Sequence, residues 1–106
     1  MAASGALLLY WQIMQPRPSI LVVDDHPEIR NSVARYLTRN GMDVATAENA
    51  AEMDVQFEAR SPDLIVLDVM MPGEDGLSAC ARLRETCTVP ILLLTALDSE
   101  ADLLKG

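Results

Sequence analysis

The chain has 106 residues, of which 50% are apolar and 23% are charged, a composition that indicates one soluble globular domain rather than a disordered or fibrous protein. Its net charge of −8 argues against a nucleic-acid-binding surface, which needs clustered lysine and arginine. The two cysteines, Cys80 and Cys87, would lie about 10.5 Å apart on one helix, too far to bridge. We therefore expect reduced thiols in a cytoplasmic protein.

The chain divides at residues 15–18, where two prolines flank an arginine. We place the domain boundary after residue 17, which gives an N-terminal extension, residues 1–17, that is uncharged up to Pro16, and a domain, residues 18–106. The apolar run of the extension is shorter than the roughly 20 residues that span a membrane. It also lacks the basic start of a signal peptide. We interpret it as an extension outside the fold, and the alternative is a short helix packed on the domain or on a partner.

After the extension, strand and helix patterns alternate. Residues 19–23 form a continuous β-branched apolar run, as expected of a strand buried on both faces. Pro27 fits the first turn of a helix that Gly41 stops. The apolar positions of that helix are Ile29, Val33, Tyr36 and Leu37. Residues 43–46 are a short, more polar strand, which we place at the edge of a sheet.

A second helix follows the short strand. Asn49 can cap it, with Glu52 three residues further on in the capping-box position. Met53 and Phe57 give this helix an apolar face, and Pro62 follows its end.

The second half of the chain repeats the alternation. Residues 64–67 are a fully apolar strand that ends at Asp68. A loop rich in proline and glycine, residues 72–76, then leads into a helix, and residues 89–94 form a fourth strand that ends at Thr95. The apolar positions of that helix include Leu77, Cys80, Ala81 and Leu83. A last helix, capped by Asp98 or Ser99, begins as the sequence stops.

Strands that alternate with helices predict an α/β fold, a doubly wound parallel sheet with helices on both faces. Sites in such sheets form at the carboxyl ends of the strands. Three strands deliver polar side chains to that edge: Asp24 and Asp25 follow the first, Asp68 the third and Thr95 the fourth. Taken singly, each is explained better as a helix cap or a turn residue.

Taken together, these residues indicate a site. Unit charges 4 Å apart repel by about 4 kcal/mol at an effective dielectric of 20, and a structural role gives no reason to gather them. A divalent cation would explain why the carboxylates are gathered, because Mg²⁺ binds carboxylate oxygens and keeps water ligands at the positions that face a phosphate. A carboxylate beside that ion can attack phosphorus, and the Thr95 hydroxyl could bond a phosphoryl oxygen.

Three segments, residues 20–25, 64–76 and 91–96, resemble the receiver domain of two-component response regulators. The resemblance runs from about residue 18 to residue 106, and residues 49–54 and 72–78 further resemble the OmpR-type subfamily. It implies a flavodoxin-like (CheY-like) three-layer sandwich with strand order 2-1-3-4. The family's fifth strand is missing from the sequence, as are the lysine and the aromatic residue of that region, and Lys105 does not match that lysine.

The resemblance also implies roles for individual residues. Asp68 matches the phosphoacceptor that takes a phosphoryl group from a sensor histidine kinase. Asp25 matches the direct Mg²⁺ ligand and Asp24 the acidic position that acts through water. Asp68 itself and the backbone carbonyl of Met70 would complete the protein's share of the coordination, and Thr95 matches the switch hydroxyl. In addition, Pro72 and Gly76 match the loop that shapes the pocket, and His26 falls at a variable position to which we assign no metal role.

Our first hypothesis is therefore a regulatory phosphoacceptor with Mg²⁺ as its cofactor, and not an enzyme. A second is an aspartate-nucleophile phosphohydrolase, although such enzymes carry a second aspartate two residues after the nucleophile, where this chain has Met70. A third is a truncated receiver that only binds partners. We expect no contact with a membrane. We expect DNA binding only through an effector domain outside this sequence. Residues 91–94, left as an open edge, would favour self-association.

Overall fold

The computed structural model describes residues 17–94, which form a four-stranded parallel sheet and three helices. The strand order is β2-β1-β3-β4, which confirms the order that the family resemblance implies. The strands are β1 (Ser19–Val23), β2 (Asp43–Ala47), β3 (Leu64–Asp68) and β4 (Ile91–Leu94). The helices are α2 (Pro27–Arg39), α3 (Ala50–Ala59) and α4 (Gly76–Arg84). The predictions for the N-terminal extension up to residue 16, for Thr95 and for the last helix fall outside the described residues.

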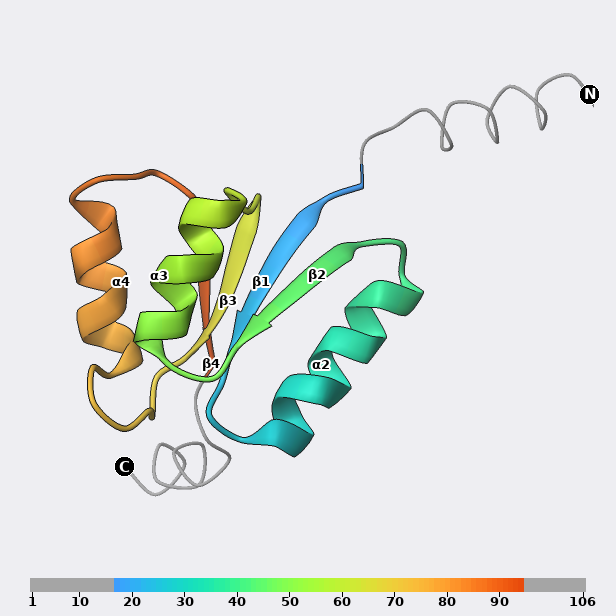
Figure 1. Ribbon diagram of the computed structural model, residues 1–106, viewed down its shortest axis with the longest axis horizontal. Coiled ribbons are helices and arrows are strands. Elements are labelled where there is room, and N and C mark those ends of the chain that lie inside the picture. The colour runs from blue at the N-terminus through green and yellow to red at the C-terminus, as the bar shows by residue number, and fades with distance from the viewer. Residues whose placement is uncertain (1–16, 95–106) are drawn as a thin grey trace, which may run out of the picture.

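The sheet is the middle layer of three. Helix α2 lies on one face, and α3 and α4 lie together on the other (Figure 1). The alternation of side chains along β1 divides the core between these faces. Leu21 and Val23 pack toward α3 and α4, whereas Ile20 and Val22 pack toward α2. This explains why the first strand is apolar at every position.

The two faces are covered unequally. On the side of α3 and α4, Met53 and Ala79 are fully buried and Leu83 is nearly so. On the other side, Val33 and Leu37 of α2 are only partly buried, and no residue of α2 is buried within the part of the chain that the structure describes. Ile29 and Tyr36, which the helical spacing placed on the apolar face, are 48% and 67% exposed.

Local sequence signals set the ends of α2. Pro27 occupies its first turn, where no backbone N–H is needed. After the helix, Gly41 has a φ of +88°, and its N–H bonds the Thr38 carbonyl while the Met42 N–H bonds the Leu37 carbonyl. These two hydrogen bonds form a Schellman motif, which needs a residue with a left-handed backbone at the position of Gly41.

The other two helices begin at side-chain caps. The Asn49 side chain accepts a hydrogen bond of 2.8 Å from the Glu52 N–H, as predicted, and the Asp75 carboxylate does the same for Ser78. The predicted apolar face of α4 was partly wrong, because Leu77 is 58% exposed and Ala79 takes the buried position. Cys80 and Cys87 are free, as expected, but Cys87 lies beyond the end of α4, so the single-helix spacing was not the reason.

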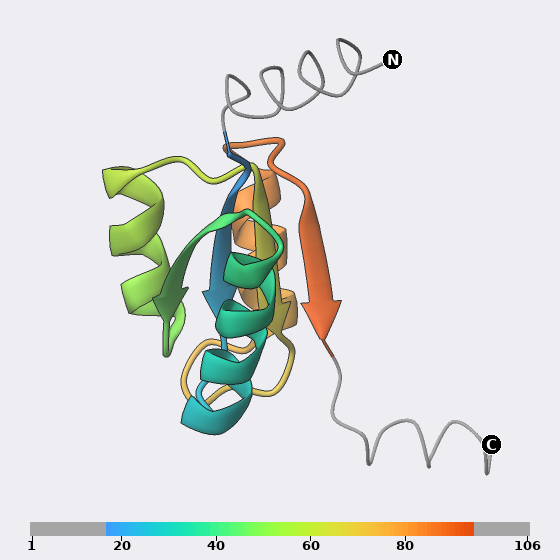
Figure 2. The same cartoon turned by 90° about the vertical axis from the view of Figure 1, so that its right-hand side faces the viewer.

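The sheet edges also match the sequence. Among the described strands, β2 and β4 occupy the two edges (Figure 2). Strand β4 begins at Ile91, two residues later than the apolar run suggested, and β2 extends one residue further, to Ala47.

No helix in residues 17–94 has the length and hydropathy needed to cross a bilayer.

Candidate functional site

The turn after β1 and the last residue of β3 bring four titratable side chains together at the carboxyl edge of the sheet. One ligand atom from each of Asp24, Asp25, His26 and Asp68 lies within 4.8 Å of the others. We call this group the acidic cluster. It forms because β1 and β3 are parallel neighbours and Val23 pairs with Leu67, so the residues that follow each pair lie side by side.

Asp24 is held in a fixed place within the cluster. It is only 3% exposed, and its backbone N–H continues the ladder to the Ala47 carbonyl at 3.1 Å. Its Oδ1 accepts a 2.8 Å hydrogen bond from the His26 N–H, and its carbonyl accepts one of 2.8 Å from Arg30 Nη1. These bonds fix the turn between β1 and α2, and with it the direction of the side chains that follow.

Asp68 has one bonded and one free carboxylate oxygen. The residue is 6% exposed, and its Oδ1 accepts a 3.1 Å hydrogen bond from the Met70 N–H. Its Oδ2 is buried and has no hydrogen-bond partner among the described residues. Burial raises the pKa of Asp68, and the nearby carboxylates of Asp24 and Asp25 raise it further, against the opposing effect of the Met70 N–H.

The ring nitrogen Nδ1 of His26 lies close to all three carboxylates. It is 3.1 Å from Asp24 Oδ1, 3.1 Å from Asp25 Oδ1 and 3.9 Å from Asp68 Oδ2. The contact with Asp25 is close but lacks hydrogen-bond geometry, so Asp25 Oδ1 is also a buried oxygen without a bond. The hydrogen bond to Asp24, followed by the charge of Asp25, raises the pKa of His26.

The loop between β3 and α4 forms the other wall of the site. The Val69 N–H bonds the Leu94 carbonyl at 3.0 Å, and the Gly76 N–H bonds the Val69 carbonyl at 2.9 Å. Met70 is 62% exposed. A pocket of about 540 Å³ opens beside the acidic cluster between this loop and the start of α2, lined by Asp25, His26, Val69, Met70, Met71, Asp75 and Leu77.

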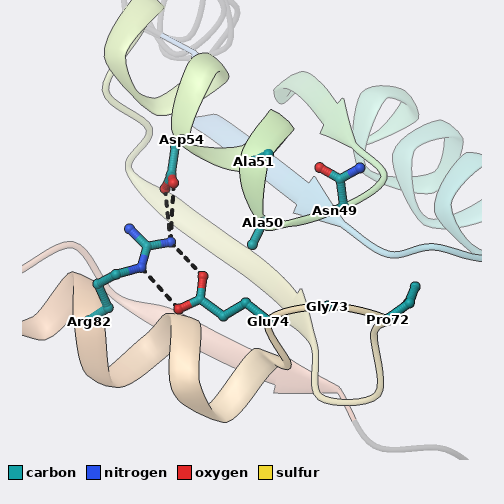
Figure 3. A pocket seen from close by; sticks show the side chains of 8 residues that line it. All are labelled: Asn49, Ala50, Ala51, Asp54, Pro72, Gly73, Glu74 and Arg82. Carbon is teal, nitrogen blue, oxygen red and sulfur yellow. Dashed lines mark hydrogen bonds and ion pairs between the residues drawn. The ribbon is translucent and has the colours of Figure 1, made fainter.

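A second feature of this edge is an arginine that joins three segments. Arg82 of α4 bonds Glu74 of the loop through two nitrogens, at 2.8 and 3.0 Å, and reaches Asp54 of α3 at 3.2 Å (Figure 3). The hydrogen bonds from Arg82 lower the pKa of Glu74. This network lines a separate pocket of about 650 Å³ next to the N-terminus of α3.

The site residues expected from the sequence therefore fall into two groups. Asp24, Asp25 and Asp68 lie together, and Met70 follows within two residues of Asp68. Thr95 lies outside the described residues. His26 was given no role in the sequence analysis, although it directly follows the aspartate pair and precedes a proline, which favours an extended backbone and a sharp turn at this position.

Comparison with known proteins gives a consistent result. The family model of the response regulator receiver domain matches residues 20–106. The transcriptional regulatory protein AfsQ1 of Streptomyces coelicolor is 44% identical over 89 residues, which cover 84% of this chain and 40% of that protein. The chain thus spans well under half the length of this relative.

Solved structures are similar as well. The BeF3-activated N-terminal receiver domain of Klebsiella pneumoniae RstA is 38% identical with a TM-score of 0.72, covering 79% of this chain and 72% of that one. The response regulator TrrA of Thermotoga maritima, in complex with Mg²⁺-BeF, is 40% identical with a TM-score of 0.70, covering 74% and 70% of the two chains.

Proposed function

The chain belongs to the response regulator receiver domain family, and from this membership we propose that Asp68 accepts a phosphoryl group from a histidine kinase in a Mg²⁺-dependent reaction. In this proposal the acidic cluster is the phosphorylation site. The product is a regulatory state of the protein rather than a released compound, so the chain acts as a phosphoacceptor and not as an enzyme with turnover.

The observation that carries this proposal is the free oxygen of Asp68. A buried carboxylate oxygen without a hydrogen bond is costly, because its hydration is lost and nothing replaces it. Such an atom needs a reason to be retained. An oxygen that attacks phosphorus or binds a cation must keep free lone pairs, whereas the other oxygen can be held in position by the Met70 N–H.

The donor set fits a hard divalent cation. Asp25 Oδ1 and Asp68 Oδ2 are both buried and accept no hydrogen bond from residues 17–94, and Asp24 lies beside them. We propose that Asp25 and Asp68 bind Mg²⁺ directly, that Asp24 acts through a water, and that the Met70 carbonyl supplies a further oxygen. An ion held there would neutralise the carboxylates and the developing charge on the phosphoryl group.

The chain's own residues would then position the transfer. A carboxylate oxygen of Asp68 attacks phosphorus and forms an O–P bond, while the N–P bond of the phosphohistidine donor breaks and its electron pair returns to the donor imidazole. The hydrogen bond from the Met70 N–H to Asp68 and the one from the His26 N–H to Asp24 hold these two carboxylates in position. Thr95 follows Leu94, whose carbonyl is bonded to Val69, and we propose that its hydroxyl binds the phosphoryl group.

We propose that phosphorylation switches a transcriptional effector. The Streptomyces relative is named as a transcriptional regulatory protein, and it is longer than the matched region. The net charge of −8 makes this chain unsuited to bind DNA by itself. We place the protein in the cytoplasm, where a histidine kinase would meet it.

Intact-mass measurement tests the phosphoacceptor directly. The full chain is incubated with a small acyl phosphate, with and without Mg²⁺, beside Asp68→Asn and the control Asp43→Asn, a carboxylate at the start of β2 that pairs with Arg60. We expect one phosphoryl group on the wild type and on the control, only with Mg²⁺, and none on Asp68→Asn. Equal incorporation in Asp68→Asn would overturn the assignment.

A further inference from the structure

His26 is the one member of the acidic cluster without a role in the proposed function. Its backbone occupies the N-cap position of α2, with φ −91° and ψ 110°, but its side chain makes no capping bond, unlike the caps of α3 and α4. The ring instead points at the carboxylates. Helix capping therefore does not explain its orientation.

The distances around the ring nitrogen resemble those of a metal coordination sphere. Metal–ligand bonds of about 2.0–2.2 Å place ligand atoms at right angles about 3 Å apart. His26 Nδ1 lies 3.1 Å from Asp24 Oδ1, 3.1 Å from Asp25 Oδ1 and 3.9 Å from Asp68 Oδ2. One cation could therefore contact the ring nitrogen, Asp25 Oδ1 and Asp68 Oδ2, in exchange for the hydrogen bond between the ring nitrogen and Asp24 Oδ1.

Burial supplies an independent indication of a ligand. Asp68 is 6% exposed and its Oδ2, which faces this nitrogen, has no hydrogen-bond partner among the described residues. The His26 side chain, in contrast, is 60% exposed, although its Nδ1 lies within 4 Å of one oxygen of each carboxylate. The cluster therefore offers several oxygens and one nitrogen to a single ion.

We propose that His26 is a further metal ligand, which makes the acidic cluster a mixed nitrogen and oxygen site that prefers transition-metal dications such as Co²⁺, Ni²⁺ and Zn²⁺ over Mg²⁺. Mg²⁺ favours oxygen ligands, whereas imidazole raises affinity for the later first-row metals. The inference rests on the cation site of the proposed function, although not on phosphoryl transfer. It adds metal selectivity to that site.

Calorimetric titration of the full chain with Co²⁺ and, separately, with Mg²⁺ tests the inference. We compare the wild type with His26→Ala and with Asn31→Ala, an exposed position of the same helix. We expect His26→Ala to weaken Co²⁺ binding by about tenfold or more and to change Mg²⁺ binding far less. Asn31→Ala should match the wild type with both ions.

A spectroscopic measurement identifies the ligand atom. His26 is the only histidine of the chain, so imidazole nitrogen couplings in pulsed EPR of the Cu²⁺-loaded protein can come from this residue alone. We expect these couplings in the wild type and their loss in His26→Ala. Wild-type protein without such couplings, or equal losses of Co²⁺ and Mg²⁺ affinity in His26→Ala, would overturn the role of His26.

The variant Asp25→Asn separates the two proposals. If it loses both ions while His26→Ala binds Co²⁺ like the wild type, the cation site stands and the role of His26 is wrong. If Asp25→Asn binds Mg²⁺ as tightly as the wild type, the cation site of the proposed function is itself wrong.

Discussion

Gly76 packs directly against the backbone carbonyl of Asp68. A Cβ on Gly76 would lie 2.8 Å from the Asp68 carbonyl carbon and from the Val69 Cα, and closer still to the Asp68 oxygen. Real Cβ atoms do not approach backbone so closely, so any other residue would push the loop after β3 away from α4. The first residue of α4 thereby fixes the backbone position of Asp68, the proposed phosphoacceptor.

Gly76→Ala is therefore expected to destabilise the fold by about 1–3 kcal/mol, as overpacking does, and to weaken Mg²⁺ binding. Gly41→Ala is the matched control, because Gly41 has a φ of +88° but open space around it, and it should cost about 1 kcal/mol of backbone strain only. Chemical denaturation and Mg²⁺ calorimetry measure both effects. Unchanged Mg²⁺ affinity in Gly76→Ala would show that the contact does not position the site.

The two adjacent aspartates should contribute unequally to Mg²⁺ binding. Asp25 Oδ1 has no hydrogen-bond partner in the described part of the chain and is available to an ion, whereas Asp24 Oδ1 already accepts the His26 N–H. We expect Asp25→Asn to weaken Mg²⁺ binding by about tenfold or more and Asp24→Asn to weaken it less. NMR-monitored titration measures both constants, with Asp43→Asn as the charge control. The reverse order of effects would contradict the assignment.

The raised pKa of Asp68 predicts an unusual pH dependence of stability. The carboxyl group binds its proton more tightly in the folded than in the unfolded protein. Without a divalent ion, its contribution favours folding at low pH and is lost as the pH rises from its ordinary pKa of 3.8 through the raised value. Asp68→Asn should therefore be more stable than the wild type at neutral pH.

Denaturation across pH, with and without Mg²⁺, measures that difference. Saturating Mg²⁺ should stabilise the wild type and reduce the advantage of Asp68→Asn, because the ion binds the folded carboxylate. If the Asp68→Asn protein is less stable than the wild type at neutral pH without Mg²⁺, the burial of an unbonded charge is not a significant cost here.

Arg82 should contribute modestly to stability through its two partners. Because its side chain is 43% exposed, solvent screens the network, and Arg82→Gln should cost about 0.5–1 kcal/mol. The pKa of Glu74 should return toward its ordinary value, which NMR titration of the Glu74 carboxyl reports. The control Arg60→Gln, which breaks the more exposed pair with Asp43, should cost less. An equal loss of stability in Arg82→Gln and Arg60→Gln would show that the link between three segments adds no stability beyond that of a single exposed ion pair.

Strand β4 is predicted to mediate self-association. Within residues 17–94 it pairs only with β3, and Leu92 is 53% exposed on it. Exposed apolar edges pair with other chains, and a charge on the edge prevents this. We expect the full chain to associate with rising concentration in sedimentation experiments and Leu92→Lys to do so less. A wild-type chain that stays monomeric at high concentration would contradict the prediction.

The sequence predicted the sheet and the acidic edge because both depend on local rules. The short β-branched apolar runs at residues 19–23 and 64–67 are typical of strands buried on both faces, and the carboxyl ends of parallel strands share an edge. The cap at Asn49 and the stop at Gly41 follow from backbone chemistry that any context shares.

The remaining features depend on tertiary placement. Leu77 is one of the apolar positions of α4, but the buried face of the helix consists of Gly76, Ala79 and Leu83, and Leu77 is 58% exposed. The Arg82 network joins residues 28 positions apart, and no local pattern indicates such a pair. The direction of the His26 ring depends on the turn that Asp24 and Arg30 hold, which the sequence alone does not reveal.

Because α2 is less buried than α3 and α4, we expect its backbone amides to exchange with solvent before those of the other two helices. None of its residues is buried among those described, so it can open locally while the packing around Met53 and Leu83 stays intact. Yet α2 begins at Pro27, and its N-cap residue His26 directly follows the paired aspartates. An ion bound at its first turn would slow this opening, so deuterium uptake in α2 would report occupancy of the acidic cluster without any label at the site.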